Sequence, residues 1–339
     1  MSKINDYSRI LSSLTLPRII NLFGLKLDYL FHHFTKNGKS RFLPFSLSIE
    51  PTTACNLGCP ECPSGLKQFT RPTGKIDLKN HQNWIKQVKK HVFYINYYFQ
   101  GEPFLHPEFL TLIQQAKKER IYTATSTNAH FIDEKKAEEI VHSGLNRLII
   151  SIDGLTQETY EAYRKQGQLD KVIAGTQNMI DAKKKLKSKT PHLIFQFLVV
   201  AANEHEIPEL MALGKKMKID EVRLKTAQLY DFKHGNSLMP KQDEYNRYKL
   251  NAKGEYQIKN KMQNHCWRMW SGSVMTWDGK LVPCCFDKDA LHTMGNLNED
   301  DFKTVWKSEN YRNFRKAVFT ERSQIEICQN CTEGSKVWA

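Results

Sequence analysis

The 339-residue sequence lacks any uninterrupted apolar run of about 18 residues, the length that a membrane-spanning helix needs. Its first residues also lack the compact apolar stretch and small-residue cleavage site of a secretory signal. We therefore expect a protein that stays in the cytoplasm. No internal repeat is visible, and a composition of 40% hydrophobic and 25% charged residues excludes wholesale disorder.

Acidic residues are outnumbered, because 50 Lys and Arg against 36 Asp and Glu give a formal net charge of +14. This excess suits nucleic acid, phospholipid or phosphorylated substrates as neighbours, and charge alone does not choose among them. The basic residues are spread along the chain and no RNA-recognition motif is present. A nucleic-acid partner is therefore not favoured.

Eight cysteines in a reducing compartment are poor candidates for disulfides. They fall in tight groups: Cys55, Cys59 and Cys62, then Cys266, then Cys284 and Cys285, and finally Cys328 and Cys331. Such grouping is typical of metal ligands, so we predict metal sites rather than cross-links.

Residues 1–43 are expected to form an amphipathic helical segment before the main domain. Thr15 and Pro17 are typical of a helix start. Apolar residues three or four apart form one stripe on that helix: Leu16, Ile19, Ile20, Phe23, Leu27, Leu30, Phe31 and Phe34. Basic residues flank the stripe, so two interpretations stand. The helix packs on the protein body, which we favour because apolar helix faces usually contact protein, or it lies on a membrane surface.

From residue 44 to 232, short β-rich runs alternate with helical stretches. The expected strands are Phe45–Glu50, Phe93–Phe99, Tyr122–Ser126, Arg147–Ile152, His192–Val199 and Glu221–Lys225. The expected helices are Leu78–His91, Pro107–Glu119, Asp133–Ser143, Gln157–Gln166, Leu169–Lys187 and Ile207–Met217. This alternation predicts an α/β fold whose parallel sheet is open or closed into a full or partial barrel, with helices outside.

Two further segments follow the β/α region. Residues 233–264 are polar and helix-prone without a strand pattern, and we interpret them as a connector. Residues 265–339 predict a compact unit with a hairpin and a helix: Ser273–Thr276 and Lys280–Pro283 joined by Asp278-Gly279, then Asp300–Ala317. A unit of this size has a small hydrophobic core and needs an additional stabilising feature such as a metal site.

The three-cysteine group follows the first expected strand directly, so its thiols project from one loop at the carboxyl end of the sheet. Structural zinc takes four protein ligands and an ordinary [4Fe-4S] cube takes four cysteines, so three thiolates leave one iron open. A zinc loop with a distant fourth ligand is the alternative. The spacing of Cys55, Cys59 and Cys62 resembles that of radical S-adenosylmethionine (SAM) enzymes, over about residues 44–230.

A second motif carries the resemblance further. Gln100-Gly101-Glu102-Pro103 follows the second expected strand and is similar to the family motif Gly-Glu-Pro, which holds the methionine amine. The resemblance implies a (β/α)6 partial TIM barrel, a [4Fe-4S] cluster on the three cysteines, and S-adenosyl-L-methionine as cofactor. It also implies reductive cleavage to a 5′-deoxyadenosyl radical, with an electron from a reducing protein such as flavodoxin or ferredoxin.

Other positions in related enzymes face the ribose and the methionine carboxylate. The matching residues here are Asn128 after the third strand, Ser151 at the end of the fourth, and Arg164 on the helix that follows. Gln196 and Lys225, on the fifth and sixth strands, either point into the barrel or stand at its rim.

The remaining cysteines resemble the C-terminal SPASM and twitch domains that carry auxiliary clusters in this family. A full SPASM domain has enough cysteines for two clusters, whereas this region has five, so the resemblance implies one auxiliary [4Fe-4S] cluster. Its ligands would be Cys266, Cys284, Cys328 and Cys331. Cys285 would be spare, because adjacent residues on a strand point in opposite directions. Zinc on the same four thiolates is the alternative.

The resemblance favours an oxidoreductase. Hydrogen abstraction beside a hydroxyl or amine leaves a strongly reducing substrate radical, whose electron a nearby cluster can accept. The alternatives are a peptide-modifying maturase, an RNA-modifying enzyme, and a non-catalytic iron–sulfur or zinc protein. Residues 1–43 are too short for the winged-helix recognition domain of many peptide maturases, which favours a small or lipid-like substrate over a peptide. No catalytic residue is assigned from the sequence.

Overall fold

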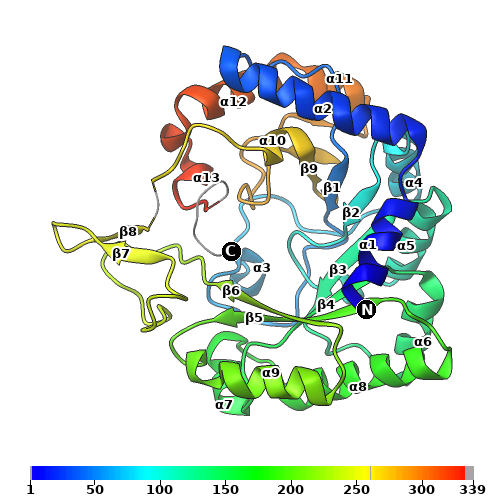
Figure 1. Cartoon of the computed structure of the whole chain (residues 1–339), viewed down its shortest axis with the longest axis vertical. Helices are drawn as coiled ribbons and strands as arrows, with labels where there is room; N and C mark the ends of the chain where they lie inside the picture. The colour runs from blue at the N-terminus through cyan, green and yellow to red at the C-terminus, as the bar shows by residue number, and fades with distance from the viewer. Residues whose placement is uncertain (1, 260, 333–339) are drawn as a thin grey trace.

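The computed structural model describes residues 2–259 and 261–332 of the chain. Its centre is a nine-stranded sheet with the strand order β11-β10-β9-β1-β2-β3-β4-β5-β6 (Figure 1). Strands β1 to β6 pair in parallel with their neighbours, and helices cover the outside of the sheet, which confirms the predicted (β/α)6 partial barrel. Met1, Asn260 and residues 333–339 of the predicted segments lie outside the described residues.

All six predicted barrel strands are present. They are β1 Ser46–Ile49, β2 Tyr94–Asn96, β3 Tyr122–Thr127, β4 Arg147–Ser151, β5 His192–Val199 and β6 Glu221–Thr226. The predicted helices are confirmed as α4 Leu78–Val88, α5 Phe109–Lys118, α6 Glu134–Ser143, α7 Gln157–Tyr163, α8 Leu169–Lys185 and α9 Ile207–Lys216. Buried strands and amphipathic helices leave strong periodic signals, which is why these predictions succeed.

The predicted C-terminal hairpin is part of the barrel wall. β9 (Gly272–Met275) and β10 (Lys280–Val282) pair in antiparallel fashion, and β11 (Gly295–Asn296) adds to β10. β9 also lies parallel to β1, with Gly272 opposite Ser46. The sequence gives no signal for this pairing, because the two strands are far apart along the chain. The predicted domain limits, at residues 1–43, 44–232, 233–264 and 265–339, stay predictions.

The secondary structure predicted for residues 233–264 is wrong. This stretch holds an antiparallel hairpin, β7 (Tyr248–Leu250) and β8 (Tyr256–Ile258), with Gly254 between the strands at a positive φ of 75°. Figure 1 shows the hairpin projecting from the side of the barrel. Each strand is only three residues long, so no apolar alternation marks it in the sequence.

The helix predicted over Asp300–Ala317 is divided into α11 (Phe302–Lys307) and α12 (Glu309–Thr320). Ser308 separates them, and its hydroxyl accepts a hydrogen bond from the Tyr311 N–H at 3.3 Å. A serine that caps a new helix competes with continuation of the preceding one. The remaining short elements of this unit are α10 (Arg268–Ser271), η3 (Arg322–Gln324) and α13 (Glu326–Gln329).

The segment before β1 forms two helices, α1 (Ser2–Ser12) and α2 (Leu16–Thr35), which meet at a bend of 100°. α2 packs on the protein body as favoured, but through the face that carries Leu25 and Tyr29. The apolar stripe predicted from the sequence faces solvent instead, which corrects the expectation that this stripe makes the contact. Among the described residues, no single helix is long and apolar enough to cross a membrane, although α1 and α2 pass that test together as a bent pair.

α1 lies at the amino ends of the barrel strands, away from the cysteine loop (Figure 1). The Asp6 carboxylate accepts hydrogen bonds from the Tyr122 hydroxyl at the start of β3 and from the Arg147 guanidinium at the start of β4. Lys3 forms an ion pair with Glu221 at the start of β6, at 3.3 Å. These contacts fix α1 to the end of the barrel that is opposite to the predicted site.

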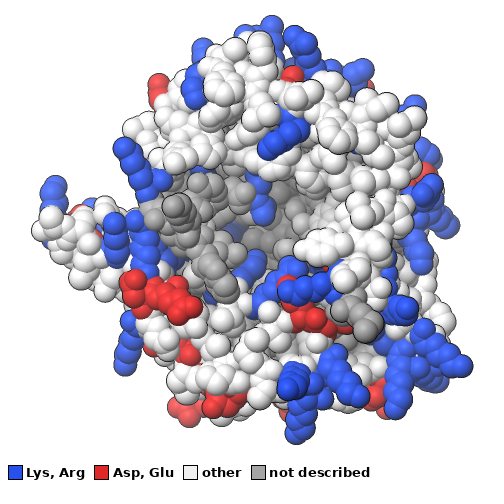
Figure 2. Space-filling model, viewed as in Figure 1, with Lys and Arg blue, Asp and Glu red and all other residues white. Residues whose placement is uncertain are grey.

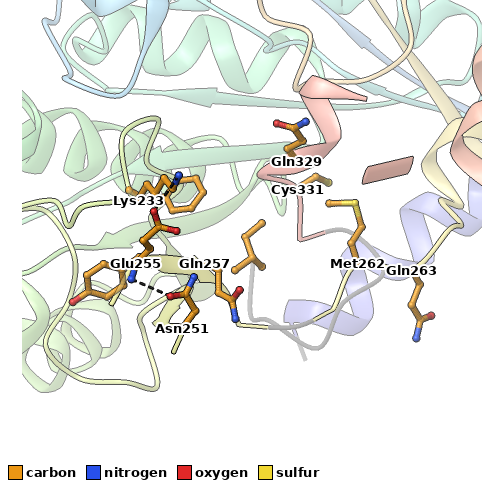
Figure 3. Close-up of a pocket in the computed structure, with 11 residues that line it drawn as sticks. Lys233, Asn251, Glu255, Gln257, Met262, Gln263, Gln329 and Cys331 are labelled. Atoms are coloured by element: carbon orange, nitrogen blue, oxygen red, sulfur yellow. Dashed lines mark hydrogen bonds and ion pairs between the residues drawn. The ribbon is translucent and has the colours of Figure 1, made fainter. Parts of the chain in front are cut away.

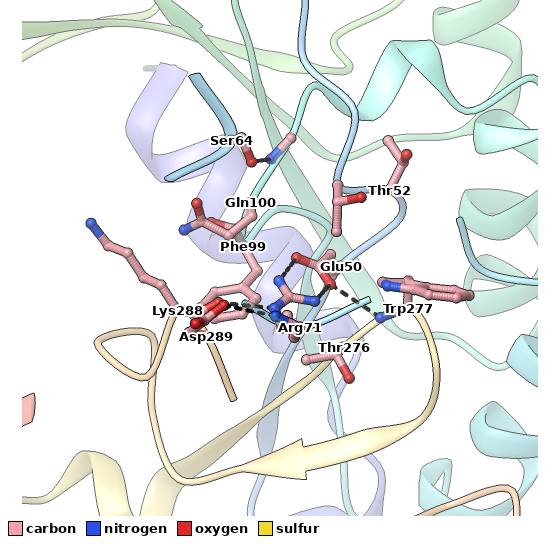
Figure 4. A network of polar contacts seen from close by, with 12 residues as sticks. Glu50, Thr52, Ser64, Arg71, Phe99, Gln100, Thr276, Trp277, Lys288 and Asp289 are labelled. Carbon is pink, nitrogen blue, oxygen red and sulfur yellow. Dashed lines mark hydrogen bonds and ion pairs between the residues drawn. The ribbon is translucent and has the colours of Figure 1, made fainter. Parts of the chain in front are cut away.

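A buried ion pair joins the barrel to the C-terminal unit (Figure 4). Arg71 donates two hydrogen bonds to the Glu50 carboxylate, at 2.9 and 2.5 Å, and Glu50 has 0% of its surface exposed. The same carboxylate accepts the Trp277 N–H at 3.2 Å, and Arg71 Nε donates to the Lys288 carbonyl at 3.0 Å. Burial raises the pKa of Glu50 despite the opposing effect of Arg71. The network therefore holds the end of β1, the segment after the cysteine loop and the C-terminal hairpin together.

Replacing Arg71 with Ala should lower the free energy of unfolding by about 3–5 kcal/mol, because the Glu50 carboxylate would stay buried without its guanidinium. Denaturant unfolding measures this change. Arg41→Ala, which removes an exposed guanidinium, is the control and should change the free energy of unfolding by no more than about 0.5 kcal/mol. Equal effects of the two substitutions would contradict the role given to the ion pair.

Candidate active site

The three cysteines of the first group lie on the loop after β1, at the carboxyl end of the barrel. Cys55, Cys59 and Cys62 all line one cavity of about 350 Å³. The Cys62 N–H donates to the Cys59 carbonyl at 3.3 Å, and the short helix α3 (Pro63–Leu66) begins directly after Cys62. The Gly58 N–H donates to the Lys165 carbonyl at 2.9 Å, which fixes the loop against the segment after α7.

Burial dominates the electrostatics of two of these thiols. Burial raises the pKa of the Cys55 thiol to about 12, and burial also raises the pKa of the Cys59 thiol. Thiolates here need a compensating positive charge, which the irons of a cluster would supply, so the residues fit such a group. Among the described residues, no three His, Cys, Asp or Glu side chains converge as a single metal ion would require. A cube differs from a single ion because each cysteine takes a different iron.

The turn after β2 approaches the cysteine loop closely. Gly101 has a φ of 76°, and a β-carbon there would lie 2.2 Å from the Thr52 carbonyl oxygen. The Gly101 N–H donates to the Ser64 hydroxyl at 2.9 Å, and the Glu102 N–H donates to the Ala54 carbonyl at 2.7 Å. Only glycine combines this backbone conformation with this contact distance.

The Glu102 carboxylate is buried and holds the end of the neighbouring strand. It accepts hydrogen bonds from the Thr127 hydroxyl at 2.8 Å, the Asn128 N–H at 2.8 Å and the Phe104 N–H at 3.2 Å. Burial raises the pKa of Glu102 to about 7 despite these donors. Gly101 and Glu102 line the cavity, whereas Pro103 is buried as the first residue of the turn η1 (Pro103–Leu105). The Glu102 carboxylate thus ties the turn after β2 to the end of β3. The turn itself borders the cavity.

Two further predicted residues reach the same cavity from strand ends. Asn128 follows β3, and its Nδ2 donates to Asn56 Oδ1 at 2.8 Å, so it also braces the cysteine loop. Ser151 ends β4 and lies opposite Gln196 of β5 in the sheet register. Gln196 lines the cavity too, so it points into the barrel.

Arg164 lies directly after α7, and two of its guanidinium nitrogens contact other residues of the protein. Its Nε donates to Asp153 at 2.5 Å, and Nη1 lies 3.7 Å from the Cys59 sulfur. Asp153 is buried, and its other oxygen accepts the Leu198 N–H at 2.6 Å. Arg164 is therefore a fixed positive charge beside the cysteine loop. That it also contacts a cofactor carboxylate stays a prediction, for which a guanidinium with five donors has capacity.

Tyr98 and Lys288 are among the residues that line this cavity and were not predicted from the sequence. Tyr98 continues the inward-facing positions of β2 after Tyr94 and Asn96, so the two-residue period of a strand could have identified it. Lys288 comes from the C-terminal unit, and no local signal in the sequence places it beside the cysteine loop.

The C-terminal cysteines come from three segments: the segment just before α10, the turn after β10, and the region of α13. Cys284 is half-buried, and desolvation raises the pKa of its thiol well above the ordinary value, with the neighbouring Cys285, then Cys266 and Cys328, adding to the effect. Arg322 lies among the group: its Nη2 is 3.4 Å from the Cys331 sulfur, and Cys266 and Cys328 also interact with its charge. That Cys266, Cys284, Cys328 and Cys331 together hold one cluster stays a prediction.

Cys285 lies beside residues of the barrel. Its sulfur is 3.7 Å from Arg268 Nη1, and its charge influences the pKa of Tyr98 and of Lys225. It borders a cavity of about 340 Å³ that also touches Ser48 of β1 and Asn96 of β2. Cys284 borders the same cavity, and both cysteines follow the end of β10 at Val282, so they are not adjacent residues of a strand as predicted. The choice of Cys284 as ligand stays a prediction.

A third cavity, of about 360 Å³, lies between the β7–β8 hairpin and the segment after α13 (Figure 3). Lys233 and Gln257 line it from the hairpin side, and Gln329 and Cys331 line it from the other. Cys331, one of the predicted ligands of the auxiliary cluster, therefore borders this cavity beside the β7–β8 hairpin.

Replacing Gly101 with Ala should weaken SAM binding by about tenfold or more, because the added β-carbon strains the backbone and meets the Thr52 carbonyl at 2.2 Å. Equilibrium binding of radiolabelled SAM to the reconstituted protein measures this. Gly254→Ala is the matched control, since Gly254 has a similar φ of 75° but nothing within 4 Å of the added carbon. Unchanged affinity in the Gly101 variant would show that the close approach is not needed.

Replacing Cys284 with Ala should reduce the iron content from about eight to about four per chain, because each cube holds four irons. Cys285→Ala should keep about eight irons. Iron counting after anaerobic reconstitution measures both. The reverse pattern would overturn the ligand assignment, and zinc in the native C-terminal unit would overturn the auxiliary iron–sulfur cluster.

Two family descriptions match this chain. The Radical SAM superfamily matches residues 49–213, and the iron–sulfur cluster-binding SPASM domain matches residues 266–332. The "Probable GTP 3′,8-cyclase" of Methanocaldococcus jannaschii is 28% identical over 275 residues, which are 73% of this chain and 86% of that protein. The "PqqA peptide cyclase" of Gluconobacter oxydans is 25% identical over 205 residues, 59% of this chain and 55% of that protein. The structure of Streptococcus suis SuiB with bound S-adenosylmethionine aligns with this chain at a TM-score of 0.64 and 16% identity. The alignment covers 86% of this chain and 73% of the SuiB chain. The chain belongs to the radical SAM superfamily and carries a SPASM domain.

Proposed function

We propose that this protein oxidises a substrate held in the barrel lumen by hydrogen abstraction, with an auxiliary [4Fe-4S] cluster as the electron acceptor. The adjacency of two cavities carries this proposal. Tyr98 borders the cavity of the three-cysteine loop, and Asn96 borders the cavity of Cys284 and Cys285. The two residues are successive inward positions of one strand segment, which are about 7 Å apart. A substrate between them would lie close to both cysteine sites.

The chain's own residues would bind and orient the cofactor. The backbone of Gly101-Glu102 borders the place for the methionine amine, and Asn128 and Ser151 offer polar groups for the ribose and the carboxylate. Arg164 supplies fixed positive charge beside Cys59. When bound, SAM and its cluster supply the hydrogen-abstracting radical, with an electron from a flavodoxin- or ferredoxin-type protein, and the auxiliary cluster supplies an acceptor for the electron that the substrate gives up.

The lumen carries positive charge, which bears on the substrate. Figure 2 shows a hollow at the centre of the molecule with Lys and Arg side chains inside it. Burial lowers the pKa of Lys225 on β6, and Arg268 and Arg223 add to that effect. Lys288 lines the cofactor cavity. We therefore propose a substrate with a carboxylate or phosphate group, because such a group would relieve the repulsion among these cations.

A peptide-modifying maturase is the second candidate. The PqqA peptide cyclase is similar in sequence, although this chain covers only 55% of its length, and SuiB has also been solved with its precursor peptide SuiA. The β7–β8 hairpin favours this candidate, because a two-stranded sheet that projects from the barrel offers edges to which an extended peptide can add. Oxidation of a peptide side chain would be consistent with both proposed functions, the oxidoreductase and the peptide-modifying maturase.

Replacing Cys55, Cys59 and Cys62 together with Ala should abolish 5′-deoxyadenosine formation from SAM under dithionite, because the cluster site would be lost. Chromatography of the reaction products measures the nucleoside. Cys284→Ala is the control and should retain its formation, since Cys284 lies in the separate C-terminal group. Undiminished formation in the triple variant would contradict the proposal.

A further inference from the structure

α2 has two apolar faces, and the protein body covers only one of them. Leu25 and Tyr29 are buried, and the Tyr29 ring packs against Trp267 and Trp270 with centroids 5.0 and 5.3 Å away. Along the other side of the helix runs a stripe of side chains that are 56–79% exposed: Leu16, Ile20, Phe23, Leu27, Phe31 and Phe34. Their spacing of three or four residues keeps them on one face, opposite to Leu25 and Tyr29.

Hydrogen bonds from Arg18 hold α2 in this orientation. The Arg18 guanidinium donates five hydrogen bonds to backbone carbonyls, at 2.6–3.2 Å, and the acceptors are Ser13, Lys89, Glu119 and Arg120. Turning the stripe inward would leave these donors and a buried charge without partners. The outward stripe is therefore a fixed feature of the fold.

α1 extends the exposed apolar surface. Ile4, Tyr7 and Leu11 are 63–71% exposed. The described residues include sixteen exposed large hydrophobic side chains, and ten of them lie on α1 and α2. Such a concentration on two helices marks a contact surface, whereas exposed apolar residues elsewhere occur singly.

The exposed charges that residues 3–41 contribute to this surface have one sign. The acidic residues of α1 and α2 are buried: Asp6 pairs with Arg147, and Asp28 accepts the Arg41 N–H at 3.1 Å. The exposed charges of residues 3–41 are all positive, at Lys3, Lys26, Lys36, Lys39 and Arg41. Figure 2 shows Lys and Arg side chains along the borders of the uncharged surface over α2. The apolar stripe and its cationic borders are therefore complementary to a partner that has an apolar interior and an anionic surface layer.

We propose that α1 and α2 form a docking surface for a bilayer that contains anionic phospholipid. The stripe enters the boundary between headgroups and acyl chains, and the flanking lysines contact the phosphates. α2 is a straight ridge of 20 residues, about 30 Å long, that lies along the protein surface, which suits a flat bilayer. A second copy of the chain fits less well, because pairing two stripes would bring the cationic borders of both copies together.

Vesicle flotation of the full-length protein tests this proposal. Wild-type protein should float with phosphatidylcholine vesicles that contain phosphatidylglycerol, and less with pure phosphatidylcholine. The stripe variant, Phe23→Ser/Leu27→Ser/Phe34→Ser, should bind the anionic vesicles at least about tenfold more weakly, because three large apolar side chains no longer enter the lipid. Lys39→Gln/Arg41→Gln should weaken binding only to the anionic vesicles.

The matched control is Met211→Ser/Leu250→Ser/Leu291→Ser, which changes side chains of comparable exposure, 51–70%, elsewhere on the surface. It should float like the wild type. Both serine variants should keep the wild-type iron content and unfolding midpoint, since every substituted side chain is exposed. Failure of the wild type to float at low salt, or equal flotation of the stripe variant, would overturn the proposal. A dimer that only the stripe variant loses, without vesicle binding, would assign the surface to a second copy.

Docking is independent of the proposed chemistry. α1 and α2 contain no cysteine and precede β1, so the stripe variant should form 5′-deoxyadenosine at the wild-type rate. Loss of flotation with retained cofactor cleavage therefore supports the surface, and loss of both activities would show that α2 supports the barrel instead.

Discussion

The burial of the Glu50 carboxylate is the constraint on which much of this structure depends. A carboxylate removed from water must have a cation and hydrogen-bond donors close by. Arg71 supplies the cation from the segment after the cysteine loop, and Trp277 supplies a donor from the C-terminal hairpin. The cysteine loop is thereby held between two fixed points, the end of β1 and Arg71. The same carboxylate fixes the hairpin to the β1 edge of the barrel, where it extends the sheet.

Close backbone approach is the second constraint, and it shapes the cofactor site. Gly101 brings the turn after β2 against Thr52 and Ala54, and the Glu102 carboxylate ties that turn to the end of β3. Three strand ends therefore converge on one cavity. Arg164 adds a fixed charge next to Cys59, held in place by Asp153. A site built in this way binds with little rearrangement, which limits the entropic cost of positioning a cofactor.

The sequence predicted those parts of the fold that leave a local signal. The barrel strands and helices could be predicted from their periodicity, and the cysteine loop from its spacing. The pairing of β9 with β1 and the ion pair of Glu50 with Arg71 join segments that are separated along the chain. The local sequence around each partner therefore contains no pattern that predicts these contacts. The β7–β8 hairpin is too short and polar to stand out. The stripe on α2 has a local signal, but its direction depends on Arg18, whose four carbonyl acceptors come together only in the folded chain.

We propose that two iron–sulfur clusters border one lumen and that only the cluster of the three-cysteine loop binds SAM. Low-temperature electron paramagnetic resonance of the dithionite-reduced protein, recorded with and without SAM, tests this directly. In the wild-type protein we expect signals from two reduced [4Fe-4S] clusters, of which one shifts when SAM is added. In Cys284→Ala only the signal that shifts with SAM should remain. A single signal that ignores SAM, or two signals that both shift, would contradict it.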